Sequence, residues 1–177
     1  MTPFEHDTYI VLELPEPFAA AVLRIRKKYD AGLSAFPAEM TVAGSSGVGP
    51  LAGKQEPEKV FTILNEIAAL QAPIKVRFKG IRRFPNTNLF YLALIDPEPL
   101  IKLHARIAAS GLRFNDAPFH FTPHCTLADL SESDEESIKS IREEVYPQKA
   151  FLLDTLSVYE VTNNRCLLQY RTMLKGK

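Results

Sequence analysis

The chain has 177 residues, 46% of them hydrophobic, and its 21 Lys and Arg balance 21 Asp and Glu, so its formal net charge is zero. This length and apolar content predict one folded domain, residues 1–177, with a substantial core. The balanced charge argues against the extended basic surface that captures long RNA or DNA. A small anionic partner remains compatible with it.

The N-terminal residues 1–14 lack the basic start and long apolar run of a signal peptide. No uninterrupted apolar stretch approaches the length of a membrane span. We therefore expect a cytoplasmic protein with no membrane partner, and we expect a monomer. Cys125 and Cys166 show no metal-ligand spacing, and we expect Cys125 to be a buried thiol.

The first half of the chain alternates between strand and helix patterns. The predicted elements are a strand over residues 9–14, a helix over 18–29, a short strand over 39–43, a helix from 56 or 57 to about 70, and a strand over 74–84 with a break at Gly80. Four cations, Arg24, Arg26, Lys27 and Lys28, lie toward the end of the first helix, where they suit the helix dipole.

The second half repeats this order and adds one strand. The predicted elements are a strand over 89–95, a helix from about 97 to 107, a strand at 121–128, a helix from about 133 to 146, a long strand over 151–161, a turn at Asn163-Asn164 and a final antiparallel strand over 166–174. Two strands hold equivalent places in the two halves, the one that begins at Glu39 and the one that contains His124.

This repeated element order predicts an α+β fold with two pseudo-symmetric lobes, each an antiparallel sheet flanked by helices. In element order the lobes cover about residues 1–88 and 89–177, and strands can exchange between them. The two short strands would then face each other across a cleft between the lobes.

The stretch Phe121-Thr122-Pro123-His124-Cys125-Thr126-Leu127-Ala128 carries the strongest chemical signal. Strand side chains alternate, so His124 and Thr126 share one face while Cys125 and Leu127 face the core. An imidazole transfers protons near neutral pH, and a hydroxyl two residues on can donate to an anionic oxygen. Together they suit a proton transfer beside a phosphoryl group. The alternative is a structural or surface histidine near a strand.

The equivalent strand in the first half, Glu39-Met40-Thr41-Val42-Ala43, places Glu39 and Thr41 on one face. A carboxylate can accept a proton, although it is repelled by a phosphate oxygen. The alternative for Glu39 is a solvated carboxylate at the edge of a sheet.

In these two strands and their order, the chain resembles the 2H phosphoesterase superfamily, which includes the bacterial 2′-5′ RNA ligase/cyclic phosphodiesterase proteins. That superfamily carries two His-x-Thr/Ser motifs, one in each lobe, lining a common cleft. His124-Cys125-Thr126, within Phe-x-Pro-His-x-Thr-Leu-Ala, is similar to the second motif, and the element order around it is similar as well. The first motif departs from the pattern, because Glu39-Met40-Thr41 keeps the hydroxyl and replaces the histidine.

The resemblance implies a metal-independent, cofactor-free phosphodiesterase that opens a 2′,3′-cyclic phosphate or a similar small phosphodiester, including a short RNA end. It implies that His124 is one acid/base group, that Thr41 and Thr126 bind the phosphate, and that Glu39 stands in for the second histidine. The alternative is a protein with weak or no activity that binds a nucleotide or an RNA end in the same cleft.

The sequence leaves the roles of several other polar residues undefined. The loop 44–54 is rich in glycine but lacks the spacing of a Walker phosphate loop, and a flap over the cleft is a further hypothesis. His104 is expected to be exposed or half-buried on its helix. The roles of the remaining candidates are not defined by the sequence, namely His6, His120, Lys54, Arg82 and Arg83.

Overall fold

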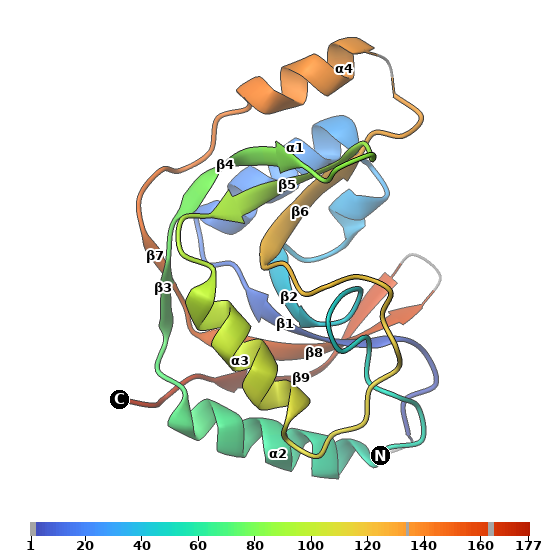
Figure 1. Cartoon of the computed structure of the whole chain (residues 1–177), viewed down its shortest axis with the longest axis vertical. Coiled ribbons are helices and arrows are strands. Elements are labelled where there is room, and N and C mark those ends of the chain that lie inside the picture. The colour runs from blue at the N-terminus through green and yellow to red at the C-terminus, as the bar shows by residue number, and fades with distance from the viewer. Residues whose placement is uncertain (1–2, 134, 163–164) are drawn as a thin grey trace.

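The structure, a computed structural model, describes residues 3–133, 135–162 and 165–177 of the chain. Its larger sheet has four antiparallel strands in the order β2-β1-β8-β9 (Figure 1). The strands are β1 (Thr8–Glu13), β2 (Glu39–Ala43), β8 (Thr155–Thr162) and β9 (Arg165–Met173). Strands from the two ends of the chain therefore share this sheet, because β1 lies between β2 and β8.

The second sheet has three antiparallel strands in the order β4-β5-β6. The strands are β4 (Phe78–Arg83), β5 (Leu89–Leu94) and β6 (His124–Asp129). Phe90 and Leu92 of β5 are fully buried, while the alternate residues are half-buried, so the strand contacts other elements on both faces. The expected α+β fold of antiparallel sheets is confirmed.

Two of the predicted long strands are each divided between sheets. Residues 74–84 form β3 (Ile74–Val76) and β4, and residues 151–161 form β7 (Phe151–Leu153) and β8. β3 and β7 pair with each other in a separate two-stranded sheet. The first break falls at Arg77 and not at Gly80, because the strand partner changes there from β7 to β5. Gly80 lies instead at a register shift within β4.

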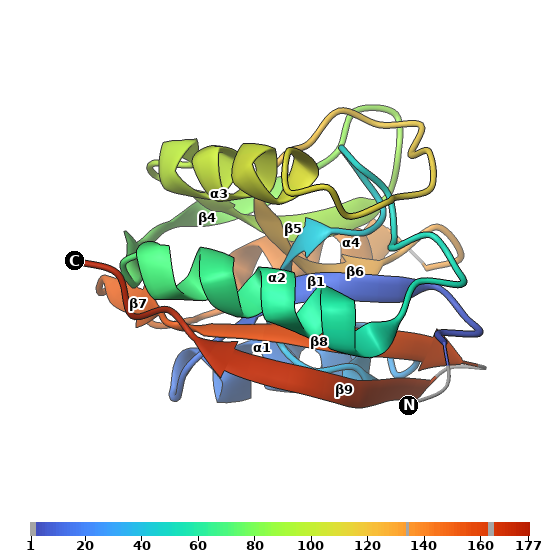
Figure 2. The same ribbon diagram turned by 90° about the horizontal axis from the view of Figure 1, so that it is seen from below.

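The helices cover the outer faces of the sheets (Figure 2). They are α1 (Phe18–Tyr29), α2 (Pro57–Leu70), α3 (Glu98–Ala108) and α4 (Glu135–Ser140), with single 3₁₀ turns η1 (Leu33–Ala35) and η2 (Ile141–Glu143). α2 packs on β9 and α3 packs on β2, whereas α1 packs on β6 and η2 on β4. α1 and α3 therefore each pack on the sheet that does not contain the strand before them, whereas α2 and η2 pack on the sheet that does.

The helix expected over 133–146 is much shorter than its pattern suggested. It comprises α4 and η2, and the backbone is already extended at Glu144. Pro147 disfavours a helical conformation at Tyr146. The Glu144 carboxylate is also held by Arg24 and Lys28 of α1, both at 2.7 Å. The predicted turn at Asn163-Asn164 lies outside the described residues.

One continuous cluster of buried apolar side chains joins the two larger sheets. The apolar stripe of α1 contributes Phe18, Val22 and Ile25 to it. Phe18 stacks on Phe151 with ring centroids 3.9 Å apart and contacts the edge of Phe78 at 6.2 Å. Within the described residues, no helix has both the length and the apolar character needed to cross a membrane.

The glycine-rich loop after β2 is bonded to the segment that precedes β6. The Gly47 amide donates to the Phe119 carbonyl at 2.8 Å, the Asn115 amide donates to the Pro50 carbonyl at 2.8 Å, and the Ala52 amide donates to the Arg113 carbonyl at 2.9 Å. The loop is therefore held along its length and does not extend as a free flap.

Gly47 sits where His104 of α3 supports the end of β2. Nδ1 of His104 donates to the Val42 carbonyl at 2.7 Å, and its ring stacks on Phe121 at 3.9 Å. Gly47 has φ +72°, and a Cβ there would collide with Cε1 of His104. The sequence placed His104 on a helix but carried no sign of this contact.

We expect Gly47→Ala to lower the free energy of unfolding by about 1–3 kcal/mol, because it combines a left-handed backbone with a steric clash. Urea denaturation measures the change. Gly53→Ala in the same loop is the control, since the nearest atom to its Cβ is 3.9 Å away. Equal effects of the two substitutions would contradict the prediction.

Candidate functional site

Glu39 and Thr41 lie side by side on β2, as the alternation predicts. Met40 and Val42 are fully buried, whereas Glu39 and Thr41 project from the opposite face and are half-buried. The Thr41 hydroxyl Oγ1 donates to Oε2 of Glu39 at 3.0 Å. The carboxylate is therefore oriented by its neighbour on the same strand.

His124 and Thr126 share the corresponding face of β6, while Cys125 and Leu127 are fully buried in the core. The prediction that Cys125 is a buried thiol is confirmed, and burial raises its pKa to about 12. Nδ1 of His124 lies 2.5 Å from the Thr122 carbonyl, which can only accept a hydrogen bond. Nδ1 therefore carries a proton, and Nε2 is the atom free to exchange one.

Two aromatic rings surround the His124 imidazole. Phe84 and Tyr91 stack on each other at 4.2 Å, and the imidazole meets them edge to face at 5.0 and 5.3 Å. The sequence pattern did not single out Phe84 and Tyr91. Tyr91 is directly opposite Thr126 in the β5–β6 ladder, so the two side chains lie on the same face of the sheet.

The two motif strands meet where the two larger sheets adjoin. β2 and β6 are edge strands of their sheets, and they contact each other (Figure 1). Among the described residues no hydrogen bond joins Glu39 directly to His124. The structure thus brings the two predicted residue pairs onto neighbouring strands, with each pair supported by its own local contacts.

The pKa values of the two candidate acid/base groups are shifted toward each other. Burial raises the pKa of the Glu39 carboxyl above its ordinary 4.5, and the charge of Arg26 and the Thr41 hydrogen bond oppose that shift. Burial lowers the pKa of the His124 imidazole below 6.5, against the hydrogen bond to Thr122. Both shifts favour the uncharged form of the group concerned, through the same cause, burial.

A second polar cluster adjoins Glu39 on the next strand. Glu13 of β1 is the cross-strand neighbour of Glu39, and its Oε1 accepts hydrogen bonds from Ser157, Tyr159 and Arg171 at 2.7–3.0 Å. These bonds lower the pKa of Glu13 although burial alone would raise it. Glu13 is thus an ionised, fully bonded carboxylate and not a second candidate base.

The other candidates from the sequence lie away from these two pairs or on the surface. His120 is exposed in the segment before β6, and His6 is exposed before β1. Arg82 and Arg83 are exposed at the end of β4, and Arg83 donates to Asn88 at 3.3 Å. Lys54 is exposed in a left-handed conformation with φ 63°.

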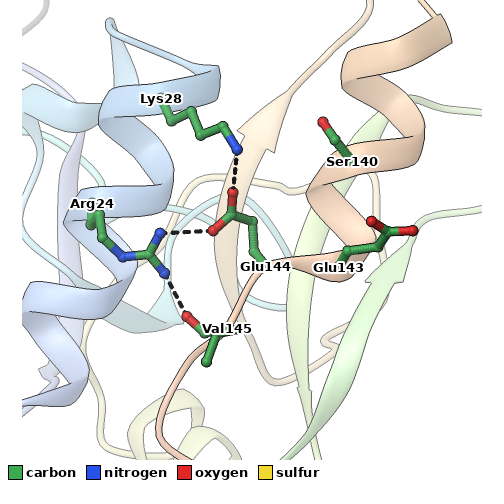
Figure 3. Close-up of a pocket in the computed structure, with 6 residues that line it drawn as sticks. All are labelled: Arg24, Lys28, Ser140, Glu143, Glu144 and Val145. Carbon is green, nitrogen blue, oxygen red and sulfur yellow. Dashed lines mark hydrogen bonds and ion pairs between the residues drawn. The ribbon is translucent and has the colours of Figure 1, made fainter.

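A surface cavity of about 550 Å³ lies between α1 and η2 and contains none of the candidate residues (Figure 3). Its lining includes Arg24, Lys28 and Glu144. The Glu144 carboxylate pairs with both cations, and these partners lower its pKa to about 2 against the opposing effect of burial. Because two carboxylates, Glu143 and Glu144, balance the two cations in its lining, this cavity is a less suitable anion site than the strand pair.

Arg26 is the residue near the site that sequence reasoning misplaced. It was grouped with three cations at the end of α1, but its side chain is only 1% exposed. The signal was present in the spacing, since positions 18, 22, 25 and 26 fall on one helical face. Arg26 therefore belongs to the interior of the molecule and not to a solvated helix end.

Among residues 3–133, 135–162 and 165–177, no group of three or more His, Cys, Asp or Glu side chains is arranged to hold a metal ion. The strand pairs instead offer two ionisable groups and two hydroxyls. Such a set can exchange protons and bind anionic oxygens.

This combination of two adjoining antiparallel sheets and paired motif strands defines a phosphoesterase-like class of protein. Residues 14–165 match the family model described as the 2′-5′ RNA ligase superfamily, and the chain belongs to this superfamily. The comparison with curated proteins found no match.

Solved structures share this fold over nearly the whole chain. TT0787 of Thermus thermophilus is 17% identical, with a TM-score of 0.66 over 97% of this chain and 99% of that one. E. coli LigT complexed with NADP⁺ is 16% identical with a TM-score of 0.63, and LigT complexed with 3′-AMP is 18% identical with a TM-score of 0.59. Both LigT matches cover 98% of this chain and 99% of that one. At these identities the likeness establishes the fold.

Proposed function

We propose that this protein is a metal-independent cyclic phosphodiesterase, a hydrolase that opens a 2′,3′-cyclic phosphate on a nucleotide or on a short RNA end. The single observation that carries the proposal is the pairing of His124-Thr126 on β6 with Glu39-Thr41 on the adjoining edge strand β2. In the proposed assignment the protein acts as a cytoplasmic monomer in RNA processing.

In the proposed reaction, the oxygen of a water molecule attacks phosphorus and the bond from phosphorus to one ribose oxygen breaks. One of the two groups, Glu39 or His124, takes the proton from water, and the other gives a proton to the departing ribose oxygen. Thr41 and Thr126 donate to the non-bridging phosphate oxygens. We assign Glu39 as the base and His124 as the acid, because a carboxylate is the more readily ionised of the two.

The surroundings of His124 support a substrate that contains a base. Phe84 and Tyr91 present half-exposed aromatic surface beside the imidazole, and aromatic faces stack on nucleobases. The two LigT structures are complexes with 3′-AMP and NADP⁺, both nucleotides. Binding of nucleotides by this chain is part of the proposal.

The test is hydrolysis of the 2′,3′-cyclic nucleotides of all four bases and of a short RNA with a cyclic phosphate end, in buffer with EDTA. Products are separated by chromatography for wild type, His124→Ala and the control His120→Ala, which removes an exposed histidine four residues away. We expect turnover by wild type and by the control, and turnover about 10²–10⁴-fold slower by His124→Ala. An inert wild type that binds nucleotide through His124 would instead indicate the alternative, a binding protein on this fold.

A further inference from the structure

Arg26 is a buried cation that bonds to β6 and to the segment immediately before β2. Its Nε and Nη2 donate to the Thr126 carbonyl at 3.0 and 2.8 Å. Its Nη1 donates to the Pro37 carbonyl at 2.8 Å and to the Phe36 carbonyl at 3.3 Å. Thr126 belongs to β6, and Pro37 lies two residues before Glu39 at the start of β2. One guanidinium from α1 therefore ties the backbone of β6 to the segment that leads into β2.

These bonds provide donors for backbone carbonyls beside the unpaired edges of β2 and β6. β2 and β6 each have one side without a ladder partner, and buried carbonyls at such an edge require a donor. The planar guanidinium presents several donors in a fixed fork, so it can serve carbonyls on two sides at once. Lysine offers one compact charge on a flexible stem and cannot reproduce this arrangement.

The charge of Arg26 has no direct partner among the described residues, since no carboxylate there lies within ion-pair distance of it. A buried cation stabilises a nearby carboxylate in its ionised form. Glu39 is such a carboxylate, and Arg26 is the leading influence that lowers its pKa against the effect of burial. An imidazole at position 39 would meet Arg26 as a like charge whenever it was protonated.

Two further cations lie around the site: Arg171 is bound to Glu13, and His124 is the candidate acid on β6. Arg26, however, is the cation whose charge lowers the Glu39 pKa. The remaining titratable groups near Glu39 do not supply a positive charge. They are Glu13 and Tyr9 on β1, Cys125 on β6 and Cys166 on β9. Each is neutral or negative, and the negative charge of Glu39 helps to raise the pKa values of Tyr9 and of both cysteines. Arg26 is thus the positive charge that favours the ionised form of the half-buried Glu39 carboxyl.

We propose that Arg26 is a positioning residue of the candidate site. It fixes the β2 strand against the β6 strand, and it supplies the positive charge that stabilises an ionised carboxylate at position 39. The departure from His-x-Thr in the first motif and the buried arginine in α1 are then two parts of one arrangement. The catalytic meaning of this inference rests on the proposed function, whereas its electrostatic part can be measured without substrate.

The first experiment is a ¹³C NMR titration of the Glu39 carboxyl in wild type, Arg26→Met, Arg26→Lys and the control Arg171→Met. Arg26→Met keeps an apolar stem and removes the charge, so the Glu39 pKa is expected to rise by about one unit or more. Arg26→Lys should keep most of the wild-type value. Arg171→Met removes the cation bound to Glu13 and should leave Glu39 nearly unchanged. An unchanged Glu39 pKa in folded Arg26→Met would overturn the proposal.

A second variant avoids any dependence on the folding of Arg26→Met. In Glu39→His with Arg26 intact, the introduced imidazole is expected to titrate below the ordinary histidine value of about 6.5. Titration at or above that value would overturn the counter-charge role.

Activity provides the separate catalytic readout. The acid limb of the kcat/KM profile should move to higher pH in Arg26→Met, following the Glu39 pKa. A limb that stays in place while the NMR pKa moves would overturn the positioning role in catalysis. If wild type is inert on every substrate while the NMR shift is observed, the proposed function fails and the electrostatic pairing of Arg26 with Glu39 stands.

Discussion

Replacing His124 with alanine is expected to lower kcat/KM for a 2′,3′-cyclic nucleotide by about 10²–10⁴-fold. Nδ1 of His124 is committed to the Thr122 carbonyl, so the ring presents Nε2 as a proton carrier with a fixed orientation. Alanine removes this carrier and leaves the buried face of β6, formed by Cys125 and Leu127, intact. Initial rates at low substrate concentration measure the loss directly.

Glu39→Gln should give a loss of similar size, because it removes the ionisable group while keeping an oxygen that can accept the hydrogen bond from Thr41. Circular dichroism and thermal unfolding of each variant show whether the fold is kept. Rates within a few-fold of wild type for either variant would exclude that residue from the chemical step. Loss in His124→Ala alone would leave Glu39 as a structural carboxylate.

The second large effect expected is a bell-shaped pH dependence of kcat/KM that lies on the acid side of neutrality. The raised pKa of Glu39 places the acid limb above pH 4.5, and the lowered pKa of His124 places the alkaline limb below pH 6.5. Beyond each limb the rate falls about tenfold per pH unit, since one of the two groups is then in the wrong protonation state. Rates measured from about pH 4 to 9 in buffers of constant ionic strength give the profile.

Glu39→Gln also decides which group is the acid. If His124 gives the proton, the residual activity of Glu39→Gln should be flat at low pH and fall as pH rises through the His124 pKa. If His124 takes the proton, the residual activity should rise with pH instead. A wild-type maximum at about pH 8 would contradict both assignments.

The β6 site could be predicted from sequence because strand parity decides which side chains share a face. Cys125 and Leu127 are fully buried as the alternation required, and His124 and Thr126 project together from the other face. The same rule placed Glu39 beside Thr41 on β2. Local periodicity thus indicated both halves of the candidate site.

Parity could not reveal contacts made between distant segments. The hydrogen bonds from Arg26 to the Thr126 carbonyl join positions 100 residues apart. Helical spacing alone shows only that Arg26 faces inward. The same limit applies to the breaks in the two long predicted strands, at Arg77 between β3 and β4 and at Asp154 between β7 and β8. Each is a point where the chain leaves one sheet for another, and a continuous β-favouring sequence carries no sign of that change in partner.

Because β1 lies between β2 and β8, folding of the larger sheet requires pairing between segments from the two ends of the chain. Thr8 pairs with Glu160, so β1, a central strand of the larger sheet, lacks one neighbour until the residues of β8 have been synthesised. Such pairing over a long sequence separation makes folding slow, on the scale of roughly milliseconds to seconds, because the intervening chain must be ordered first. During translation β1 therefore has one unpaired edge until β8 is made. An unpaired strand edge can pair with another chain, so newly made chains are prone to associate at this stage.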